Sequence, residues 1–591
     1  MKLIFSIVTL CMISFAFSQE EVKDSVKENK ITVYGGVESN SQWYLNDKNR
    51  EINASELTKN KPLRSNNYIQ VNANYRRFTA GIQVEAYESL ALLNYNPGYK
   101  GLGVGTFYAN YKSKTLDITL GHFYEQFGSG LIFRTWEDRA LGINNALRGA
   151  RVVYKPLESV SLTAIYGKQR TGFHVASSDI FGFNTDVELS TLLNQSNYQL
   201  TVGFSGIAKD EEIPSFIVNP GFSRLTKAYS GRINYSKSGF YIGTEYNIKD
   251  NEPVLLGANL NNEFVKQGNA ALLNFGYSKK GFGLDASFRR MENMLFLSER
   301  QPVVYAPEIS SLFFNDRMLN FTPALTKQHH SNLANIYVYQ AQNRVAMQFD
   351  ENIEKFGEIG GQIDLFYDFK KGTKLGGKYG TKLAVNFSSW FNLDADYSYT
   401  DQFGGFAPSY NTKFFGGNDK YFSDFNFEVS KKLSPKFRGN LMYSNQFYND
   451  QYIRGIAQSN VIKTNILFAE GVYNFSGSKA LTFGLEHMWA NNDRGNWAAF
   501  NIEYTHNQNW SVFMIDMYNY GFDEDSNNIL IAGHIDKFDI HFYNFGAAYR
   551  KGSTRIAVNY GRQRGGLVCA GGVCRFVPPS TGLGITLTKS F

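Results

Sequence analysis

The stretch that decides the fold covers residues 116–156 and reads LDITLGHFYEQFGSGLIFRTWEDRALGINNALRGARVVYKP. Its first residues alternate between apolar and polar, with Leu116 and Ile118 on one side of an extended chain. Its last residues alternate again, with Val152 and Tyr154 sharing a side. Residues two apart lie on the same face of a β-strand. The stretch therefore predicts two strands joined by an irregular excursion.

The excursion is dense in charge and also rich in large apolar side chains, so it needs a place where charges pair and rings pack. We interpret it as a segment that folds into the lumen of a transmembrane β-barrel and narrows it. An extracellular loop with solvated charges is the alternative. Charges around a narrow aperture select permeants by sign, whereas ion pairs to the wall would keep the barrel shut. The residues expected at this constriction are Arg134, Glu137, Asp138, Arg139, Arg148 and Arg151.

Strand-like alternation continues from Ile31 to the last residue, as in residues 282–289. The polar partners are often charged, and a charge facing lipid costs a few kcal/mol, so the polar face is expected to border a watery interior. Short turns near residues 238, 280, 371 and 552 alternate with long polar segments, including 171–197 and 402–421. That layout is typical of outer-membrane barrels, with the short turns periplasmic. We predict an all-β, antiparallel barrel of about 22–24 strands.

Composition agrees with a barrel. The chain contains 37 Tyr, 49 Phe and 54 Gly but only 13 Pro. The aromatic girdles of a barrel are rich in Tyr and Phe, and its strands alternate between apolar and polar faces, so a composition of this kind is expected. After the first residues there is no apolar run of the ~20 residues that a spanning helix needs. With 60 basic and 53 acidic residues, the charge is nearly balanced and no nucleic-acid partner is expected.

Three regions are expected along the chain. Residues 1–18 have Lys2, an apolar run and small residues before Gln19, which predicts a secretory signal peptide. Residues 19–30 form a short charged periplasmic linker, and residues 31–591 form the barrel in the outer membrane of a bacterial cell. Outer-membrane lipid is the expected surrounding.

Two further segments carry predictions. Residues 291–358 lack a regular turn rhythm and are expected to form a large extracellular loop that folds inward, with irregular strands as the alternative. The final residues, TGLGITLTKSF, form an amphipathic strand that ends at Phe591. Such a strand is similar to the element that the barrel assembly machinery recognises, so that machinery is an expected partner.

The segments GHFYEQFGSGLIFRTWEDRALGINNALRGARV and RQRGGLVCAGGVCRFVPPSTGLGITLTKSF carry a family resemblance. They resemble an uncharacterised outer-membrane β-barrel family of Bacteroidota, a domain of unknown function, over the whole mature chain. The resemblance implies a large barrel in the outer membrane. It implies no activity and no catalytic residues.

Cys569 and Cys574 flank a Gly-Gly pair in the last long connection. In an exported protein, two nearby thiols are expected to form a disulfide. A metal pair is the weaker alternative because no third ligand is evident. The nearby basic residues are expected either to contact anionic sugars, lipid headgroups or a partner protein, or to belong to a rigid turn that sets the register of the last strand. They are Arg562, Arg564 and Arg575.

No spacing in the chain is diagnostic of an enzyme. His534, Asp536 and His541 lie close together in sequence, but surface histidines explain them as well as a catalytic role does. The acidic run at 523–528 lacks the spacing and central glycine of a calcium loop. We therefore expect no catalytic residue, no metal site and no cofactor.

Two functions compete on this sequence. The first is a channel or exporter for small polar or charged solutes, selected by the infolded segment and the long loops. The second is a non-transporting barrel that serves as a scaffold or accessory subunit of an outer-membrane secretion, assembly or surface-lipoprotein complex, with protein partners at its extracellular loops. The abundance of interior charge favours transport.

Overall fold

The computed structural model describes residues 30–50, 61–89, 91–92, 98–212, 223–252, 254–256, 259–261, 267–299, 317–343, 346–347, 354–398, 409–454, 461–521, 528–531, 534–537, 539–570 and 572–591.

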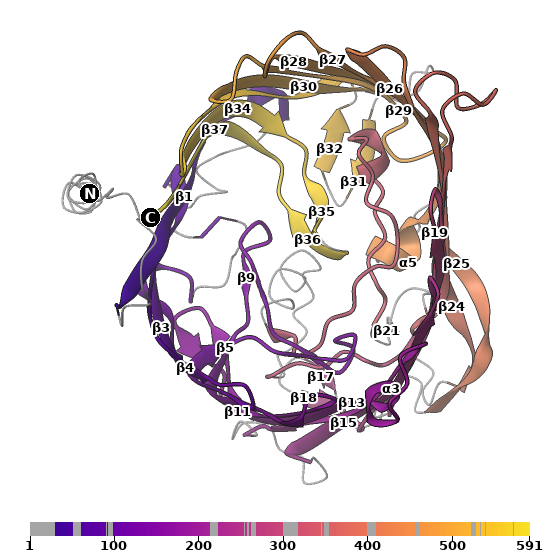
Figure 1. Cartoon of the computed structure of the whole chain (residues 1–591). Coiled ribbons are helices and arrows are strands. Elements are labelled where there is room, and N and C mark those ends of the chain that lie inside the picture. The colour runs from indigo at the N-terminus through magenta and orange to yellow at the C-terminus, as the bar shows by residue number, and fades with distance from the viewer. Residues whose placement is uncertain are drawn as a thin grey trace.

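The described residues form a closed antiparallel barrel of 24 wall strands, which confirms the predicted fold class and strand number. Figure 1 shows the ring that these strands make. The last strand, β37, pairs with both β34 and β1, so that the wall has no open edge. The wall strands in order are β1 (Thr32–Tyr44), β2 (Leu63–Tyr75), β3 (Phe78–Glu88), β4 (Gly101–Lys112), β5 (Leu116–Phe123), β10 (Leu147–Leu157), β11 (Val160–Thr171), β13 (Asp179–Glu188), β14 (Gln199–Asp210), β15 (Leu225–Lys237), β16 (Phe240–Lys249), β19 (Gly268–Lys279), β20 (Phe282–Glu292), β23 (Glu358–Phe369), β24 (Thr381–Ser398), β25 (Ser409–Lys432), β26 (Phe437–Asn449), β27 (Val461–Asn474), β28 (Ala480–Ala490), β29 (Asn496–Thr505), β30 (Trp510–Gly521), β33 (Ile540–Lys551), β34 (Thr554–Gln563) and β37 (Ser580–Ser590).

Shorter elements lie in the connections. The paired short strands are β6 (Gln126–Phe127) with β7 (Phe133–Arg134), β8 (Glu137–Asp138) with β9 (Ile143–Asn144), β17 (Val254–Leu256) with β18 (Asn259–Asn261), β21 (Ala346–Met347) with β22 (Glu354–Lys355), β31 (Asn528–Ile531) with β32 (His534–Lys537), and β35 (Gly566–Ala570) with β36 (Val573–Val577), while β12 (His174–Val175) pairs with β11. Single helical turns occur at η1 (Lys48–Arg50), α3 (Leu189–Leu192), η2 (Leu333–Asn335) and α5 (Asp450–Arg454).

Tight turns gather at one end of the barrel and most long connections at the other. The predicted tight turns at 238–239, 280–281 and 552–553 all join neighbouring wall strands at the same end, where β1 starts and β37 finishes. We call this the short-turn end. The prediction of a long loop was wrong for two segments. The segment 171–197 contains β13, and 402–421 overlaps β25, because both strands carry enough polar residues to read as loops.

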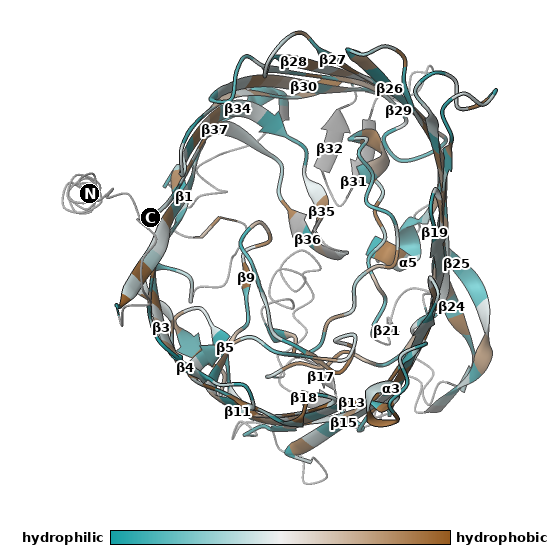
Figure 2. Ribbon diagram, viewed as in Figure 1, coloured by the Kyte–Doolittle hydropathy of each residue, from teal (hydrophilic) through white to brown (hydrophobic). Residues whose placement is uncertain are grey.

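The two faces of the wall differ as the alternation predicts. In β16 the side chains of Glu245 and Asn247 are buried inside the barrel, while Tyr246 and Ile248 are 46% and 38% exposed on its outside. Alternating apolar and polar bands are visible along the wall strands in Figure 2. An outer face of Tyr, Phe, Leu and Ile suits lipid contact. Among the described residues, no helix is long and apolar enough to cross a membrane.

The connections after β5, β20 and β34 contain many buried side chains and lie inside the ring in Figure 1. We call residues 124–146, between β5 and β10, the first inner segment. The second inner segment comprises the described residues 293–299, 317–343, 346–347 and 354–357 between β20 and β23, and their inward course agrees with the expected loop. The inner hairpin is 564–579, with β35 and β36. Together these three form what we call the plug.

The wall behind the second inner segment is apolar, which corrects the prediction of a uniformly watery interior. Tyr339 of that segment stacks on Trp390 of β24 and Phe422 of β25, with ring centroids 5.5 Å apart in each case. Met488 and Trp497 of the wall are also fully buried in this cluster. The lumenal side chains of these strands are covered by the second inner segment rather than by water. One part of the lumen is therefore a dry core.

Candidate functional site

The parts of the plug are bonded to one another through their backbones. In the first inner segment, the Arg134 amide donates to the Leu319 carbonyl at 2.8 Å, and the Gly130 carbonyl accepts from the Phe321 amide at 2.9 Å. The second inner segment meets the inner hairpin through the Ala324 amide, which donates to Gly572 at 2.8 Å. These bonds join three connections far apart in sequence into one body.

The approach of the hairpin to the second inner segment requires glycine at position 572. A Cβ atom on Gly572 would lie 2.8 Å from the Ala324 carbonyl oxygen, and the residue has a positive φ of 80°. Both features are unfavourable for a residue with a side chain. The hairpin also reaches the first inner segment, because the Arg575 guanidinium donates to the Leu141 carbonyl.

The predicted constriction charges of the first inner segment face the wall and each other. Arg139 donates to Glu38 of β1 at 2.6 Å, to Gln83 of β3 at 2.9 Å and to Glu137 at 3.2 Å. Its guanidinium lies 4.4 Å from the centre of the Tyr68 ring. The Arg139, Glu38 and Glu137 side chains remain 26%, 25% and 23% exposed. This ion-pair group therefore borders a space that water can enter.

Two other predicted residues serve the plug itself. The Arg134 guanidinium lies 3.8 Å from the centre of the Phe321 ring, a cation–π contact between the first and second inner segments. Burial lowers the pKa of Arg134, which stays charged at neutral pH. Asp138 accepts from the Leu141 amide at 2.9 Å and so closes a local turn.

The remaining two predicted residues lie on opposite faces of β10. Arg151 points into the lumen and pairs with Glu125 at 2.5 Å and Asp117 at 3.5 Å. Arg148 is exposed and follows Leu147, which is fully buried in the lumen. Because successive side chains of a strand alternate between its faces, Arg148 lies on the outer side of the wall. The structure thus brings Arg134, Glu137, Asp138, Arg139 and Arg151 to the inside and separates Arg148 from them.

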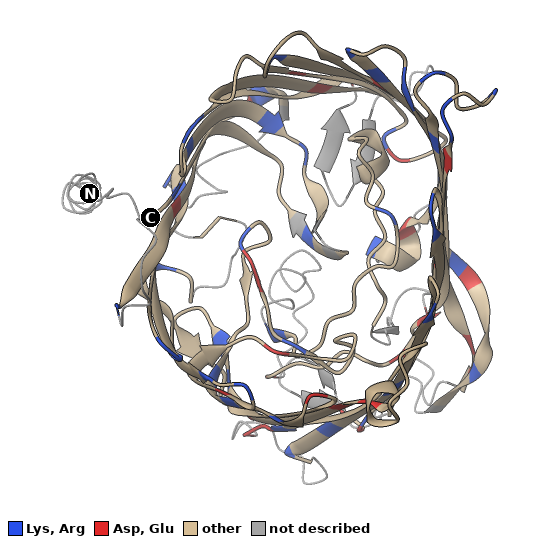
Figure 3. Cartoon of the chain, viewed as in Figure 1, with Lys and Arg blue, Asp and Glu red and all other residues tan. Residues whose placement is uncertain are grey.

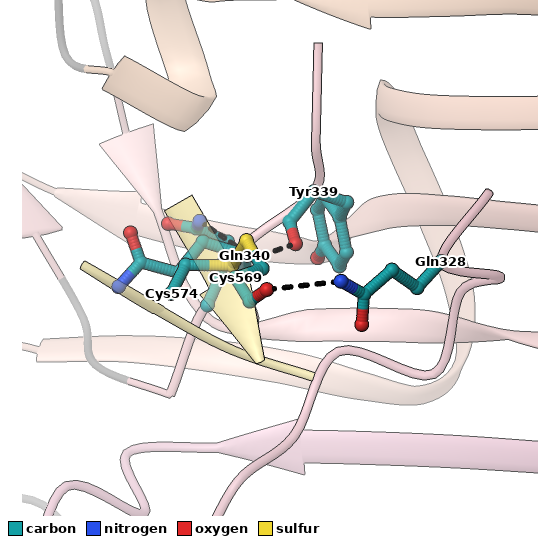
Figure 4. The surroundings of a disulfide bond; sticks show 6 residues. Gln328, Tyr339, Gln340, Cys569 and Cys574 are labelled. Carbon is teal, nitrogen blue, oxygen red and sulfur yellow. Dashed lines mark hydrogen bonds between the residues drawn. A yellow bond between two sulfur atoms is a disulfide. The ribbon is translucent and has the colours of Figure 1, made fainter. Parts of the chain in front are cut away.

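The predicted disulfide between Cys569 and Cys574 is formed, and it closes the inner hairpin (Figure 4). The Cys569 carbonyl accepts from Gln328 at 3.1 Å, and Cys574 lies 3.7 Å from the Tyr339 carbonyl oxygen. The ring of residues that it closes is small, with a sequence separation of 5, so its stabilisation is confined to the hairpin.

The three arginines near this disulfide face the barrel rather than an outside partner. Arg562 forms two bonds with Asp47, at 2.6 and 3.0 Å. Arg575 is 1% exposed within the plug. Arg564 lies near Arg494, and burial together with that like charge lowers its pKa to about 10. Arg562 and Arg575 thus bond other residues of this chain, and contact of this loop with an external ligand stays a prediction beside the alternative of a rigid turn.

The strongest anchors of the plug are charges that the sequence analysis did not single out. Arg289 of β20 and Glu358 of β23 form an ion pair in which both side chains are at most 1% exposed. Arg170 of β11 and Glu85 of β3 form a second buried pair, which lies between strands of the wall. Glu486 of β28 accepts four hydrogen bonds from residues 331–333. Figure 3 shows charged residues both on the plug and along the ring.

Histidines of the described residues contact polar side chains, and one of them, His329, contacts Asp424, which also accepts from the Ser444 hydroxyl at 2.9 Å. His541 contacts Asp516 at 2.7 Å, and His487 contacts Tyr520 at 2.6 Å. No group of three or more His, Cys, Asp or Glu in the described part of the chain is placed to hold a metal ion. Most of the acidic run at 523–528 lies outside the described residues.

A family model, "Family of unknown function (DUF6029)", matches residues 1–591. The chain belongs to this family. No curated protein matches the chain. Among solved structures, the P pilus usher (PapC) translocation pore is similar at 8% identity and a TM-score of 0.37, over 95% of this chain and 99% of that chain. The copper transporter OprC is similar at 10% identity and a TM-score of 0.39, over 97% of this chain and 82% of that chain. The siderophore receptor PirA from Pseudomonas aeruginosa is similar at 8% identity and a TM-score of 0.38, over 96% of this chain and 81% of that chain.

In this member of the family, the candidate site is thus the plug and the wall charges that hold it. A signal for the missed anchors is present in the sequence. Arg289 closes the alternating run 282–289 on its polar side, and Glu486 lies on the polar side of 481–486. A charge on the polar side of a strand-like run marks a lumenal position, because a charge that faces lipid costs ~2–4 kcal/mol.

Proposed function

We propose that this protein is an outer-membrane barrel that passes small polar or charged solutes, with the plug setting the size and charge of what passes. The observation that carries the proposal is the Arg139, Glu38 and Glu137 group. It joins the plug to the wall and yet stays about a quarter exposed. Charges that line a narrow aqueous gap discriminate between permeants. A ring of 24 strands is wide, since barrels of ~16–18 strands already leave an aqueous channel, so selectivity needs a plug.

A polar lining nearer the short-turn end supports the same proposal. The Asn386 amide donates to Asp364 at 2.6 Å and its oxygen accepts from Asn426 at 3.1 Å. Lys327 of the second inner segment donates to Asn426 at 3.0 Å and pairs with Glu428 at 2.6 Å. Lys327 and Glu428 remain 22% and 21% exposed and can meet a hydrated solute, whereas Asn386 and Asn426 are at most 1% exposed and hold this pair from behind. The short-turn end would then face the periplasm, and the outer face of the wall would contact lipid.

A scaffold without transport is the second candidate, and the buried anchors favour it. The Arg289–Glu358 and Arg170–Glu85 pairs are almost fully buried, as in a core that does not open. In that case protein partners would bind the long connections. In either case we propose that the barrel assembly machinery recognises β37 together with the residue after it, Phe591, which exchanges backbone bonds of 2.9 and 3.0 Å with Gly35. The Bacteroidota origin also remains a proposal.

Single-channel recording in a planar bilayer tests transport directly. We expect small, steady current steps from the native protein. A variant in which residues 566–577 are replaced by a short Gly-Ser link should give steps several-fold larger, because it lacks the hairpin that joins the plug. A silent native protein together with a conducting variant would favour the scaffold, and the Cys569→Ser/Cys574→Ser variant, which keeps the hairpin length, serves as the control.

Ion selectivity should depend on Arg139 but not on Arg148. Arg139→Gln removes the cation that neutralises Glu38 and Glu137, so we expect the ratio of cation to anion permeability to rise about two-fold or more, as lumenal charge sets selectivity. Arg148→Gln removes the same charge from the outer side of the wall and is the matched control. Reversal potentials in a salt gradient measure the permeability ratio of each variant. Equal shifts in the two variants would contradict the lumenal assignment.

A further inference from the structure

A polar groove crosses the rim of the barrel at the short-turn end, away from the plug. Its volume is about 690 Å³, within the range of ~300–1,000 Å³ usual for small-molecule sites. Its floor is made by the ends of β14, β15, β16 and β19, and its edge by the connection 189–198, which includes α3. Figure 1 shows α3 beside β13 and β15 at the ring.

The floor of the groove belongs to the lumenal face of the wall. Gln199 lies opposite Ser236 in the register of β14 and β15, and Ser236 lies opposite Tyr241 of β16. Tyr241 is an even number of residues from Glu245 and Lys249, whose side chains are buried inside the barrel. Because the strand period is two, Tyr241 points to the same side as they do. A solute entering or leaving the lumen at this end would pass over these residues.

The chemistry of the groove is that of neutral hydrogen bonding. Ten of its fourteen lining residues carry a hydroxyl or amide side chain, and its one acidic and one basic residue, Glu188 and Lys237, cancel in charge. The side chains of Gln195, Asn197 and Gln199 are exposed and point to water. Amides and hydroxyls both donate and accept, which matches a ligand that carries many hydroxyl groups.

One aromatic ring is held across the floor. Gly276 of β19 lies opposite Tyr241, and a Cβ atom at Gly276 would come within 2.1 Å of the Tyr241 ring. The ring therefore covers the space that a side chain at position 276 would take. The Tyr241 hydroxyl donates to Asp285 of β20, which fixes the ring at its far end. Tyr241 is still 37% exposed, so part of the ring is open to the groove.

We propose that this groove binds a neutral polyhydroxylated solute, a sugar or a short oligosaccharide, at the mouth of the lumen. The sugar hydroxyls would bond the amides and hydroxyls of the lining, and an apolar C–H face of the sugar would pack on the Tyr241 ring. The proposal deepens the proposed transport function and rests on it for the route of the solute. The same chemistry would also suit the glycan strands of a cell wall.

Binding is tested on the full-length protein in detergent, with maltotriose as the probe and calorimetry as the readout. We expect a dissociation constant of about 1 mM, which is ordinary for a shallow site. Tyr241→Ala should weaken binding at least about ten-fold. Gly276→Ala should weaken it similarly because the added Cβ displaces the ring. Tyr241→Phe, which keeps the ring, should retain most of the affinity.

Tyr108→Ala is the matched control, because Tyr108 is a lumenal tyrosine of β4 that bonds Asn72 at 3.1 Å and lies outside the groove. Co-sedimentation with peptidoglycan sacculi distinguishes the two sources. Tyr241-dependent sedimentation without maltotriose binding assigns the groove to wall glycan. Maltotriose binding by a protein that shows no current would support the groove and contradict transport. Current without any Tyr241-dependent binding of maltotriose or sacculi would overturn the groove.

Discussion

Replacement of Arg289 by alanine is expected to lower the free energy of unfolding by about 3–5 kcal/mol, because it leaves a buried carboxylate without its cation. Glu358 is 0% exposed and accepts from two Arg289 nitrogens, at 2.9 and 2.5 Å. Its second oxygen accepts from the Tyr339 hydroxyl at 2.6 Å and the Gln342 amide at 2.7 Å. Arg289 also donates to the Pro323 carbonyl at 2.8 Å, so the change removes a bond between wall and plug as well.

Urea unfolding of the protein in detergent, followed by tryptophan fluorescence, measures this change. Trp390 is a sensitive reporter because the Arg289 guanidinium lies 5.2 Å from the centre of its ring. The double variant Arg289→Met/Glu358→Gln should lose less free energy of unfolding than Arg289→Ala, because it leaves no unpaired charge buried. Arg224→Ala, which breaks a pair with side chains 56% and 41% exposed, is the control and should change little. Equal losses for Arg289→Ala and Arg224→Ala would show that burial of the pair does not matter.

The barrel could be predicted because its wall depends on a local pattern. A strand shows each face at every second residue, so the alternation in 282–289 reveals both the strand and the side on which Arg289 lies. The same rule explains the misplacement of Arg148. Arg148 and Arg151 are three residues apart and must lie on opposite faces once β10 is known to start at Leu147. The excursion before β10 has no period, and so the start of the strand could not be located from sequence.

The existence of the plug could be predicted from the sequence, but its assembly could not. Arg575 bonds Leu141 across 434 residues, and nothing in the spacing of those residues indicates a partner. The dry part of the lumen does leave a signal in β27. Ile466, Leu467 and Phe468 are consecutive apolar residues, so the lumenal face of this strand is apolar as well as the outer face. Ile466 and Phe468 are indeed at most 2% exposed inside the barrel, while Leu467 is 42% exposed on the outside.

Replacement of Glu486 by alanine should release the second inner segment from the wall. Glu486 is 5% exposed and accepts from the backbone amides of Asn332 at 3.1 Å and Leu333 at 2.9 Å, where η2 begins. It also accepts from the Ser331 hydroxyl at 2.5 Å and the Asn332 side-chain amide at 2.9 Å. Each buried donor left without an acceptor costs about 1–3 kcal/mol. We therefore expect the free energy needed to open the segment to fall by about 3 kcal/mol, so that the segment opens roughly a hundred-fold more often.

Hydrogen exchange at the Ile336 amide measures that opening, because this amide donates to the Leu333 carbonyl at 3.1 Å and does not depend on Glu486 as its acceptor. Glu486→Gln keeps one acceptor oxygen and should show a smaller increase in exchange. Leu485→Ala, at a neighbouring side chain that is 64% exposed on the outer face, should leave the exchange unchanged. Unchanged exchange in Glu486→Ala would mean that the apolar contacts around Tyr339 alone hold the segment. Faster exchange with larger current steps would identify this carboxylate as the point at which the plug controls passage, whereas faster exchange without current would favour the scaffold.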